Sequence, residues 1–358
     1  MSNSQAQRID LRSDTVTHPT PSMREAMYRA EVGDDVYGED PSINRLEELA
    51  ARKVGKQAAL FVPSGTMGNA IAMLTHCRRG DEILMGDRSH TYLYEVGGPA
   101  RLNGSFARSI PTLADGTLDA GYLAASFHGD DIHEARTGLL CVENTHNMCG
   151  GRVLSPATLA ELSAFARDKG IPMHMDGARL FNAAVALGVS ASELATPVDS
   201  VMFCLSKGLS APVGSIVAGT DEFIKEARRA RKLLGGGMRQ AGIVAAAGIV
   251  ALTEMVDRLA LDHANARRLA EGLAELPGIL IDPESVQTNI LFFGLDGPEG
   301  TPAPVEPLVA AAEAYGVLVS GGDDGRIRAV THYGITADEI EQALGVFSQA
   351  LREVTALV

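Results

Sequence analysis

The sequence predicts an α/β fold, with a mainly parallel sheet covered by helices on both faces and a smaller C-terminal α+β domain. Three observations predict it. Short apolar runs typical of buried strands alternate with amphipathic helical patterns as far as Leu252. A long charged helical pattern then begins at Met255, followed by short strand patterns and a last helix. The 358 residues, 46% hydrophobic and 21% charged, are enough to bury a large core.

Six strands are predicted in the first part of the chain, because each is a short apolar run bounded by turn residues. They are Ala58–Val62, Glu82–Met85, Leu139–Glu143, Pro172–Met175, Val201–Leu205 and Ser215–Ala218. The helical patterns among them include Ser42–Lys53, Pro156–Asp168 and Asp221–Leu233. This alternation indicates parallel strands joined by helical crossovers, a sheet that binds ligands beyond the carboxyl ends of its strands.

The C-terminal part is predicted to begin with a helix over Met255–Leu276 and to end with a helix over Ala337–Val354. Two or three short strands are expected between them, around Ile290–Phe293, Val317–Val319 and Arg326–Val330. The Gly/Pro-rich stretch Asp296–Pro307 is predicted as a surface loop. We therefore expect an N-terminal arm over residues 1–20, a large domain over 21–254 and a small domain over 255–358.

The charge and the apolar runs exclude two classes of partner. The formal net charge is −14 and there is no long basic run, which argues against nucleic-acid binding. The longest apolar run, Ala241–Leu252, is far shorter than the roughly 20 residues that span a bilayer, so we expect a buried helix and no membrane partner. The four cysteines lack zinc spacing and the first residues lack a signal peptide, so we expect a cytoplasmic protein with reduced thiols and no metal site.

The run from Val201 to Gly208 is apolar and strand-like, and it ends in Ser206, Lys207 and Gly208. An ammonium group beside a buried strand must be paired or neutralised. A Schiff base between Lys207 and a bound carbonyl cofactor would meet that requirement. Taken alone, a serine and a lysine after a strand are more often a surface turn.

A second run of this kind, Ile171–Arg179, places Asp176 at the end of an apolar stretch. Asp-Gly alone is mostly turn chemistry. However, Asp176 and Lys207 are separated by the length of one helical crossover between neighbouring parallel strands. Pyridoxal phosphate requires an aspartate for its protonated pyridine nitrogen and a lysine for its aldehyde. The pair therefore predicts a pyridoxal-phosphate enzyme.

A small-residue loop, Ser64–Asn69, joins the strand at Ala58–Val62 to a helical run that includes Ala70–Thr75. Backbone amides at such a helix start bind anions, and the hydroxyls of Ser64 and Thr66 add donors. The loop lacks the Gly-Lys-Ser/Thr ending of a P-loop and is not a dinucleotide fingerprint. A ligand with one phosphate fits it best.

Polar residues also follow the other predicted strands, which suggests that they converge at one edge of the sheet. They are Ser64, His90, Asn144, Asp176 and Lys207.

Eight motifs, in order along nearly the whole chain, resemble the low-specificity L-threonine aldolases. They are Leu11–Thr17, Gly33–Pro41, Ser64–Asn69, Ser89–Glu95, Glu143–Asn147, Asp176–Arg179, Ser206–Gly208 and Leu234–Gln240. The resemblance implies the aspartate-aminotransferase-like fold (fold type I of the pyridoxal-phosphate enzymes) with a seven-stranded sheet. The chain departs from the family pattern at His18, where lysine is common, and at Glu134, where an aromatic residue is frequent.

The resemblance implies roles for the residues around the cofactor. Lys207 would hold the aldehyde and Asp176 the pyridine nitrogen, while His90 would stack on the ring near the substrate hydroxyl. Gly65 and Thr66 would bind the phosphate. Without the resemblance, a turn histidine with its hydrogen bonds satisfied would be the favoured interpretation of His90.

The resemblance also implies contacts to the substrate and to a second subunit. Ser13, Arg179 and Arg328 would bind the substrate carboxylate, a task that suits guanidinium groups; Arg179 is also counted among the cofactor contacts. Tyr37 would reach into a neighbouring site, and Arg239 would contact the phosphate or another subunit. Taken alone, Tyr37 could be ordinary packing, Arg328 an edge-strand charge and Arg179 a surface ion pair.

Two more residues complete the predicted site. Tyr94, in the same motif as His90, is assigned to the substrate, and His133 matches a second family histidine. His133 also has the character of a solvated loop residue, because it follows Asp130 and Asp131. The general base is left open among His90, His133 and water.

The implied reaction is retro-aldol cleavage of L-threonine or L-allo-threonine to glycine and acetaldehyde, as in glycine biosynthesis and threonine catabolism. The resemblance suggests a homotetramer built as a dimer of dimers. The nearest rival is a fold-type I β-eliminating amino-acid lyase, which would release ammonia and pyruvate. A non-catalytic cofactor-binding module is a further alternative, against which the proposed carboxylate contacts argue.

Overall fold

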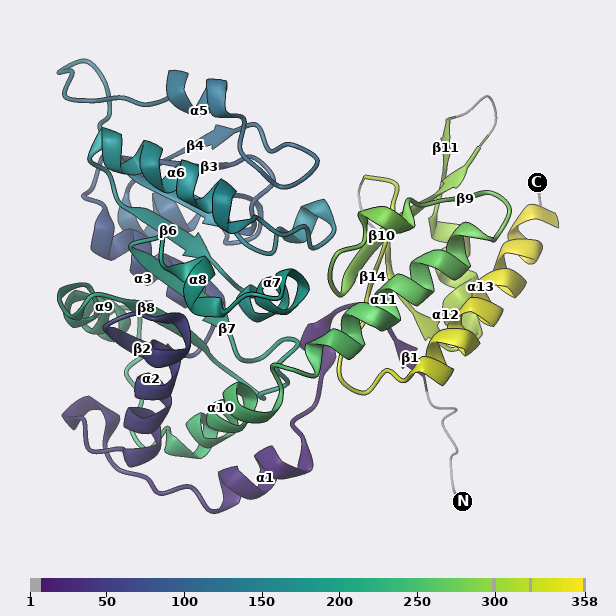
Figure 1. Ribbon diagram of the computed structural model, residues 1–358, viewed down its shortest axis with the longest axis horizontal. Coiled ribbons are helices and arrows are strands. Elements are labelled where there is room, and N and C mark those ends of the chain that lie inside the picture. Colours follow the sequence, from purple (N-terminus) through teal and green to yellow (C-terminus); the bar gives the residue numbers. More distant parts are fainter. Residues whose placement is uncertain (1–7, 298–300, 322–323, 357–358) are drawn as a thin grey trace. The chain divides into compact units, whose positions relative to one another are not determined.

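The structure of the chain is a computed structural model that describes residues 8–297, 301–321 and 324–356. Two compact units make up the chain, as Figure 1 shows. The larger unit is continuous, from His18 to Asp257, whereas the smaller unit joins the chain up to Thr17 with the chain from Arg258 onward. Within the described ranges, none of the helices combines the length and apolar character needed to cross a bilayer.

A seven-stranded sheet forms the centre of the larger unit, with the strand order β2-β8-β7-β6-β5-β3-β4. Its strands are β2 (Ala58–Val62), β3 (Glu82–Gly86), β4 (Phe106–Ile110), β5 (Thr137–Glu143), β6 (Met173–Asp176), β7 (Ser200–Cys204) and β8 (Ser215–Gly219). The strands from β7 to β4 are parallel, and β8 is antiparallel to both of its neighbours. The prediction of a mainly parallel α/β sheet is thus confirmed.

All six strands predicted in this unit are present, and the seventh, β4, was not found among the apolar runs. Phe106-Ala-Arg-Ser, the first part of β4, is mostly exposed at the edge of the sheet. An edge strand with polar residues lacks the apolar run that identifies a buried strand.

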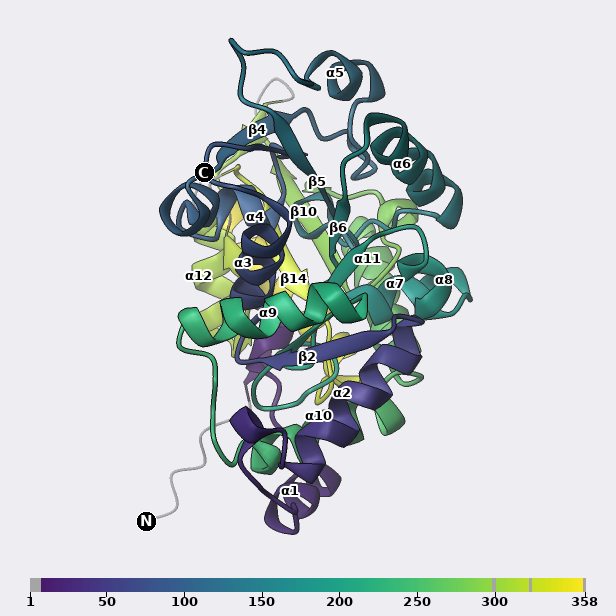
Figure 2. The same cartoon turned by 90° about the vertical axis from the view of Figure 1, so that its left-hand side faces the viewer.

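Helices cover both faces of this sheet. On one face α3 (Gly65–His76) and α9 (Asp221–Leu233) pack together and against β2 and β8, and on the other face α2 (Pro41–Val54) packs against the same two strands. Figure 2 shows β2 between α9 and α2. The apolar run predicted as a buried helix forms α10 (Gly242–Glu254), which packs against α1 (Pro21–Tyr28) and α2. The other helices of this unit are α4 (His90–Leu93), α5 (Ala120–Ala125), α6 (Pro156–Lys169), α7 (Leu180–Leu187) and α8 (Ala191–Ala195).

Side-chain caps fix where the main helices begin. Ser64, Ser155 and Thr220 accept hydrogen bonds from backbone amides in the first turns of α3, α6 and α9, and Asp40 does the same for α2. These caps satisfy amides that have no partner within the helix. The predicted helix Asp221–Leu233 has the same bounds in the structure, and the Thr220 cap explains where it begins.

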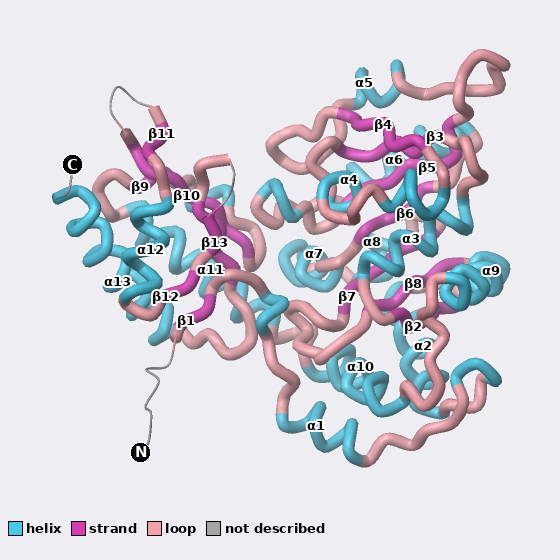
Figure 3. The backbone as a smooth tube through the Cα atoms, turned by 180° about the vertical axis from the view of Figure 1, so that it is seen from behind, coloured by secondary structure: helices cyan, strands magenta, loops and turns pink. Residues whose placement is uncertain are grey.

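The smaller unit contains an antiparallel sheet with the order β11-β10-β14-β13, with β9 also paired to β10. Its strands are β9 (Ile279–Leu280), β10 (Ile290–Asp296), β11 (Pro302–Ala303), β13 (Ser320–Gly321) and β14 (Ile327–Val330), and its helices are α11 (Leu259–Ala274), α12 (Glu306–Ala314) and α13 (Ala337–Ala356). A separate parallel pair joins β1 (Ile9–Asp10) to β12 (Val317–Leu318), and the two lie side by side in Figure 3.

The prediction of a loop over Asp296–Pro307 was wrong for most of its described residues. β10 runs to Asp296, β11 pairs with its end, and α12 begins at Glu306; residues 298–300 lie outside the described residues. Proline in the first turn of a helix needs no amide partner, so Pro307 is compatible with the start of α12. The predicted helix Met255–Leu276 is shorter in the structure, where α11 starts at Leu259.

Candidate active site

A cavity of about 260 Å³ lies in the larger unit, at the carboxyl ends of β2, β6 and β7. β2 is antiparallel to β8, which is antiparallel to β7, so β2 and β7 run in the same direction and end at the same edge. This topology brings loops that are distant in sequence to one place. The polar side chains that line the cavity are Ser64, Thr66, Asn69, His90, Glu95, Asp176, Ser206 and Lys207.

One wall of the cavity is the amino-terminal end of α3. Ser64 caps this helix, with its Oγ 3.2 Å from the amide nitrogen of Met67. The amides of Gly65 and Thr66 belong to the first turn, where no carbonyl of the same helix can accept from them. A Cβ at Gly65 would lie 3.0 Å from Cys204 Sγ, so the helix start lies close against the end of β7. This end of α3 can bind a phosphate group.

Asp176 ends β6 and is buried. Its Oδ1 accepts a hydrogen bond from the amide of Ala178 at 3.0 Å, and its Oδ2 accepts one from Asn69 Nδ2 at 2.9 Å. These two donors orient the carboxylate while it still lines the cavity. A carboxylate held in this way can stabilise a protonated ring nitrogen.

Lys207 lies in the short connection between the antiparallel strands β7 and β8. The amide of Ser210 donates to the carbonyl of Lys207 at 2.8 Å, and the amide of Leu205 donates to the carbonyl of Gly214 at 3.0 Å. Gly214 has a φ of +104°, and a Cβ there would lie 2.3 Å from the ring of Phe61. Glycine is therefore required at that turn, which fixes the loop that places Lys207 in the cavity.

His90 opens α4, and its backbone amide donates to Glu143 Oε2 at 2.7 Å. Its Nδ1 lies 3.0 Å from Glu95 Oε1. This hydrogen bond raises the pKa of His90 above its ordinary value; burial opposes the rise and the charge of Asp176 adds to it. An imidazole with such a partner can hold and release a proton near neutral pH.

The ligand atoms of His90, Glu95 and Asp176 lie within 4.8 Å of one another, a spacing that could hold a metal ion. In this structure hydrogen bonds already use these atoms, since Asn69 Nδ2 donates to Glu95 Oε1 at 2.8 Å as well as to Asp176. The cluster is therefore explained by hydrogen bonding alone.

Of the five residues expected to converge after strands, four line the cavity and Asn144 does not. The side chain of Asn144 instead pairs with the backbone of Leu154, with both distances 3.1 Å. Asn144 does lie at the same edge of the sheet, where its backbone amide donates to the carbonyl of Asp176 at 2.9 Å, but its side chain bonds to Leu154 and does not line the cavity.

Other predicted residues of the larger unit lie outside the cavity lining. Arg179 is buried and its Nη1 lies 3.3 Å from Asn147 Oδ1. Arg239 pairs with Asp34 at 2.9 Å, and Tyr37 is 77% exposed. The hydroxyl of Tyr94 lies 3.3 Å from Met148 Sδ, with the Tyr94 ring 5.7 Å from that of His90.

His133 is also outside the cavity lining. Its side chain is 82% exposed, with Nδ1 3.0 Å from Asp131 Oδ1. In this structure His133 is thus a solvated loop residue.

Ser13 and Arg328 belong to the smaller unit. Ser13 caps a short 3-10 helix through the amide of Thr15, and Arg328 Nη1 donates to the carbonyl of Arg12 at 3.0 Å. The two predicted carboxylate contacts therefore lie near each other within that unit.

Sequence reasoning assigned no role to Asn69 and Glu95, although both stand inside motifs that it identified. Both are buried and both line the cavity. The signal that could have indicated Asn69 is a polar amide on the otherwise apolar face of α3.

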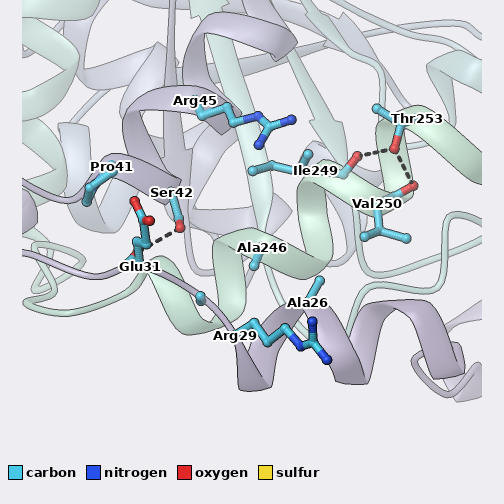
Figure 4. A pocket seen from close by; sticks show the side chains of 11 residues that line it. Ala26, Arg29, Glu31, Pro41, Ser42, Arg45, Ala246, Ile249, Val250 and Thr253 are labelled. Atoms are coloured by element: carbon cyan, nitrogen blue, oxygen red, sulfur yellow. Dashed lines mark hydrogen bonds between the residues drawn. The ribbon is translucent and has the colours of Figure 1, made fainter.

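A larger hollow, of about 520 Å³, is bounded by α1, α2 and α10 and is shown in Figure 4. Arg29, Arg45 and Ser42 contribute polar groups to it, and the Ser42 hydroxyl donates to the carbonyl of Glu31 at 2.7 Å. It contains neither a lysine nor a histidine. Of these two cavities, the smaller one combines a lysine, a histidine, buried carboxylates and an anion site, so chemistry rather than volume identifies it as the candidate active site.

The chain is similar to known proteins both in sequence and in fold. A family model described as "Beta-eliminating lyase" matches residues 10–295. The chain is 46% identical over 347 residues to "Low-specificity L-threonine aldolase 1" of Arabidopsis thaliana, covering 96% of each chain. It is 46% identical over 334 residues to the low specificity L-threonine aldolase of Escherichia coli K12, covering 93% of this chain and 96% of that one. The fold resembles that of Leishmania major threonine aldolase, with a TM-score of 0.81, 19% identity and coverage of 95% and 99%.

Proposed function

The chain belongs to the low-specificity L-threonine aldolases, and we propose that it cleaves L-threonine and L-allo-threonine at the Cα–Cβ bond with pyridoxal phosphate as cofactor. The products are glycine and acetaldehyde, which makes the protein a carbon–carbon lyase. The observation that carries the proposal is the meeting of Lys207, Asp176 and the amino-terminal end of α3 in one cavity.

The residues present fit the cofactor. The amine of Lys207 can bond to the cofactor aldehyde, and the oriented carboxylate of Asp176 can pair with the cofactor ring nitrogen. The backbone amides of Gly65 and Thr66 can bind the cofactor phosphate. A solved structure with a similar fold, of SPT, contains pyridoxal phosphate as an internal aldimine, which supports this cofactor. When bound, the cofactor supplies an electron sink for the charge left at Cα.

His90 is the proposed base that takes the proton of the substrate β-hydroxyl. It lines the same cavity as Lys207, and Glu95 accepts from its other side and so orients the ring. Such an arrangement lets the imidazole gain a proton without leaving a buried charge unpaired. The resemblance further supports Ser13, Arg179 and Arg328 as the groups that bind the substrate carboxylate.

A homo-oligomer is also part of the proposal. Val36, Tyr37 and Leu233 are exposed apolar side chains, and Arg231 and Arg239 bond to the segment around Asp35 that carries two of them. Exposed apolar side chains gathered in one region are typical of an interface. A second copy covering this region would give Tyr37 and Arg239 the inter-subunit roles that the resemblance implies.

The test is an absorbance spectrum of the purified protein with cofactor, before and after L-threonine, with acetaldehyde and glycine measured together. We expect a visible cofactor band and equal amounts of the two products. Lys207→Ala should abolish both, whereas Lys225→Ala, on an exposed turn of α9, should change neither.

Two other results would contradict the proposal in different ways. A band with pyruvate and ammonia in place of acetaldehyde would indicate the β-eliminating lyase. A protein without any band at saturating cofactor would show that Lys207 does not bind an aldehyde.

A further inference from the structure

A row of four buried or half-buried polar side chains leads from the outer end of α3 to the candidate active site. His76 Nε2 lies 2.8 Å from Ser200 Oγ, and the same Oγ lies 2.8 Å from His174 Nδ1. His174 Nε2 lies 3.1 Å from Asn69 Oδ1. Asn69, Ser200 and His174 are fully buried.

Regular secondary structure brings these residues together. Asn69 and His76 are seven residues apart on α3 and so lie on one face of the helix. His174 and Asp176 are two residues apart on β6 and so lie on one face of the sheet, and His174 pairs with Ser200 in β7.

The hydrogen bonds of this row have a single consistent direction. Glu95 and Asp176 can only accept while ionised, so the NH₂ group of Asn69 must face them and its Oδ1 must face His174. His174 therefore donates from Nε2. If it is neutral, its Nδ1 must accept from Ser200, and the Ser200 oxygen must then accept from His76.

Both histidines are held neutral. Burial lowers the pKa of His174 to about 3, and burial lowers the pKa of His76 to about 4. At neutral pH each ring therefore has one donor and one acceptor, as the single direction requires. The ring of His76 also stacks on Phe223 with centroids 4.7 Å apart, which limits its rotation.

We propose that His76, Ser200 and His174 are positioning residues that act through Asn69 to keep the carboxylates of Asp176 and Glu95 oriented and side by side. The row fixes which way the Asn69 amide faces, and that amide supplies a donor to each carboxylate. Asp176 then keeps the cofactor ring nitrogen protonated, while Glu95 sets the charge of His90. The inference rests on the proposed function, because it concerns the cofactor that Asp176 would meet.

The first test compares two replacements of His174 in cofactor-loaded protein. His174→Gln keeps a donor where Nε2 stands, whereas His174→Leu removes it and frees the Asn69 amide to turn. We expect His174→Leu to weaken cofactor binding about tenfold or more and to shift the pH titration of the visible band, since hydrogen bonds to charged groups contribute about that much. His174→Gln should remain within about threefold of the unmodified protein in binding and keep its titration.

A matched pair of serine variants keeps the test decisive if His174→Leu fails to fold. Ser200→Ala removes the middle of the row, whereas Ser163→Ala removes an equally buried hydroxyl on α6 that bonds to the carbonyl of Pro197. We expect Ser200→Ala alone to shift the band titration and weaken cofactor binding. The thermal midpoint of unfolding, measured for both, separates this effect from general loss of stability.

The outcomes distinguish this inference from the proposed function. If the Gln and Leu variants of His174, or the two serine variants, give the same band titration and the same cofactor dissociation constant, the positioning role is overturned. If the unmodified protein itself develops no visible band with pyridoxal phosphate, the proposed function fails, and this inference fails with it.

Discussion

Glu95 is the residue on which the chemistry of His90 most depends. It is buried, and its Oε1 meets both His90 Nδ1 and Asn69 Nδ2. Its hydrogen bond to His90 is the largest cause of the raised pKa of that histidine. The carboxylate therefore determines the pH at which His90 is free to take a proton.

We predict that Glu95→Gln moves the acid limb of the kcat/KM profile to lower pH. A base must be deprotonated to act, and a pKa raised by Glu95 falls when the charge is removed. The measurement is kcat/KM for acetaldehyde release from pH 5 to 9, with Glu161→Gln, on the exposed side of α6, as control. An acid limb that stays in place would show that His90 is not the base or that Glu95 does not set its pKa.

At the level of single residues, the sequence could predict functional side chains that lie at or directly after the end of a strand. It could not predict contacts between side chains that are far apart in the sequence. Lys207 and Asp176 both follow apolar runs, so their chemistry could be recognised locally. Asn69 meets Asp176 across 107 positions of sequence, and no local pattern contains that contact. His133 lies outside the cavity lining, and its ring bonds to Asp131 two residues earlier in the same exposed loop.

Helix α3 contributes both the anion site and Asn69, so its distance from the sheet matters. Gly68 makes this close approach possible: a Cβ there would lie 2.6 Å from Met202 Cγ and 3.1 Å from Val217 Cγ2. Both neighbours are buried side chains of β7 and β8 with little room to move.

We predict that Gly68→Ala destabilises the larger unit by about 1–3 kcal/mol, because the helix must move outward to avoid the overlap. The displaced helix start should also bind the cofactor phosphate less tightly. The control is Gly121→Ala in α5, where the nearest atom to an added Cβ is 3.5 Å away. Thermal unfolding and cofactor titration measure the two effects, and equal behaviour of both variants would contradict the assigned packing.

Helices and strands whose apolar residues form a clear run or a regular spacing could be predicted. Strands that form by pairing with a neighbouring strand could not. The six buried strands and the capped helix α9 follow from local sequence. β4 was missed because most of its side chains are exposed, and β11 because it is two residues long and forms only by pairing with β10. Such strands form because a neighbouring strand pairs with them, not because of their own sequence.

For the whole molecule, the proposed homo-oligomer gives a direct prediction. Leu233→Asp places a charge on an exposed apolar position two residues after Arg231, which pairs with Asp35, and should reduce the mass seen by analytical ultracentrifugation. Tyr122→Asp, on α5, makes the same kind of change at another exposed apolar side chain and should leave the mass unaltered. A monomeric unmodified protein, or equal effects of the two variants, would refute this interface.

The whole fold was predictable as α/β with a smaller α+β part, since alternating strand and helix patterns allow few other architectures. The reversal of β8 was not predictable, because its apolar sequence is that of any buried strand. That reversal makes the connection carrying Lys207 a short loop rather than a helical crossover.

The pairing of β1 with β12 has a consequence for how the chain folds as the ribosome makes it. Ile9 pairs with Val317, so β1 has no strand to pair with until Val317 has been synthesised. The larger unit, by contrast, is one continuous segment and can fold soon after Asp257 emerges. The smaller unit is therefore completed after the larger one, once β12 has been made and can pair with β1.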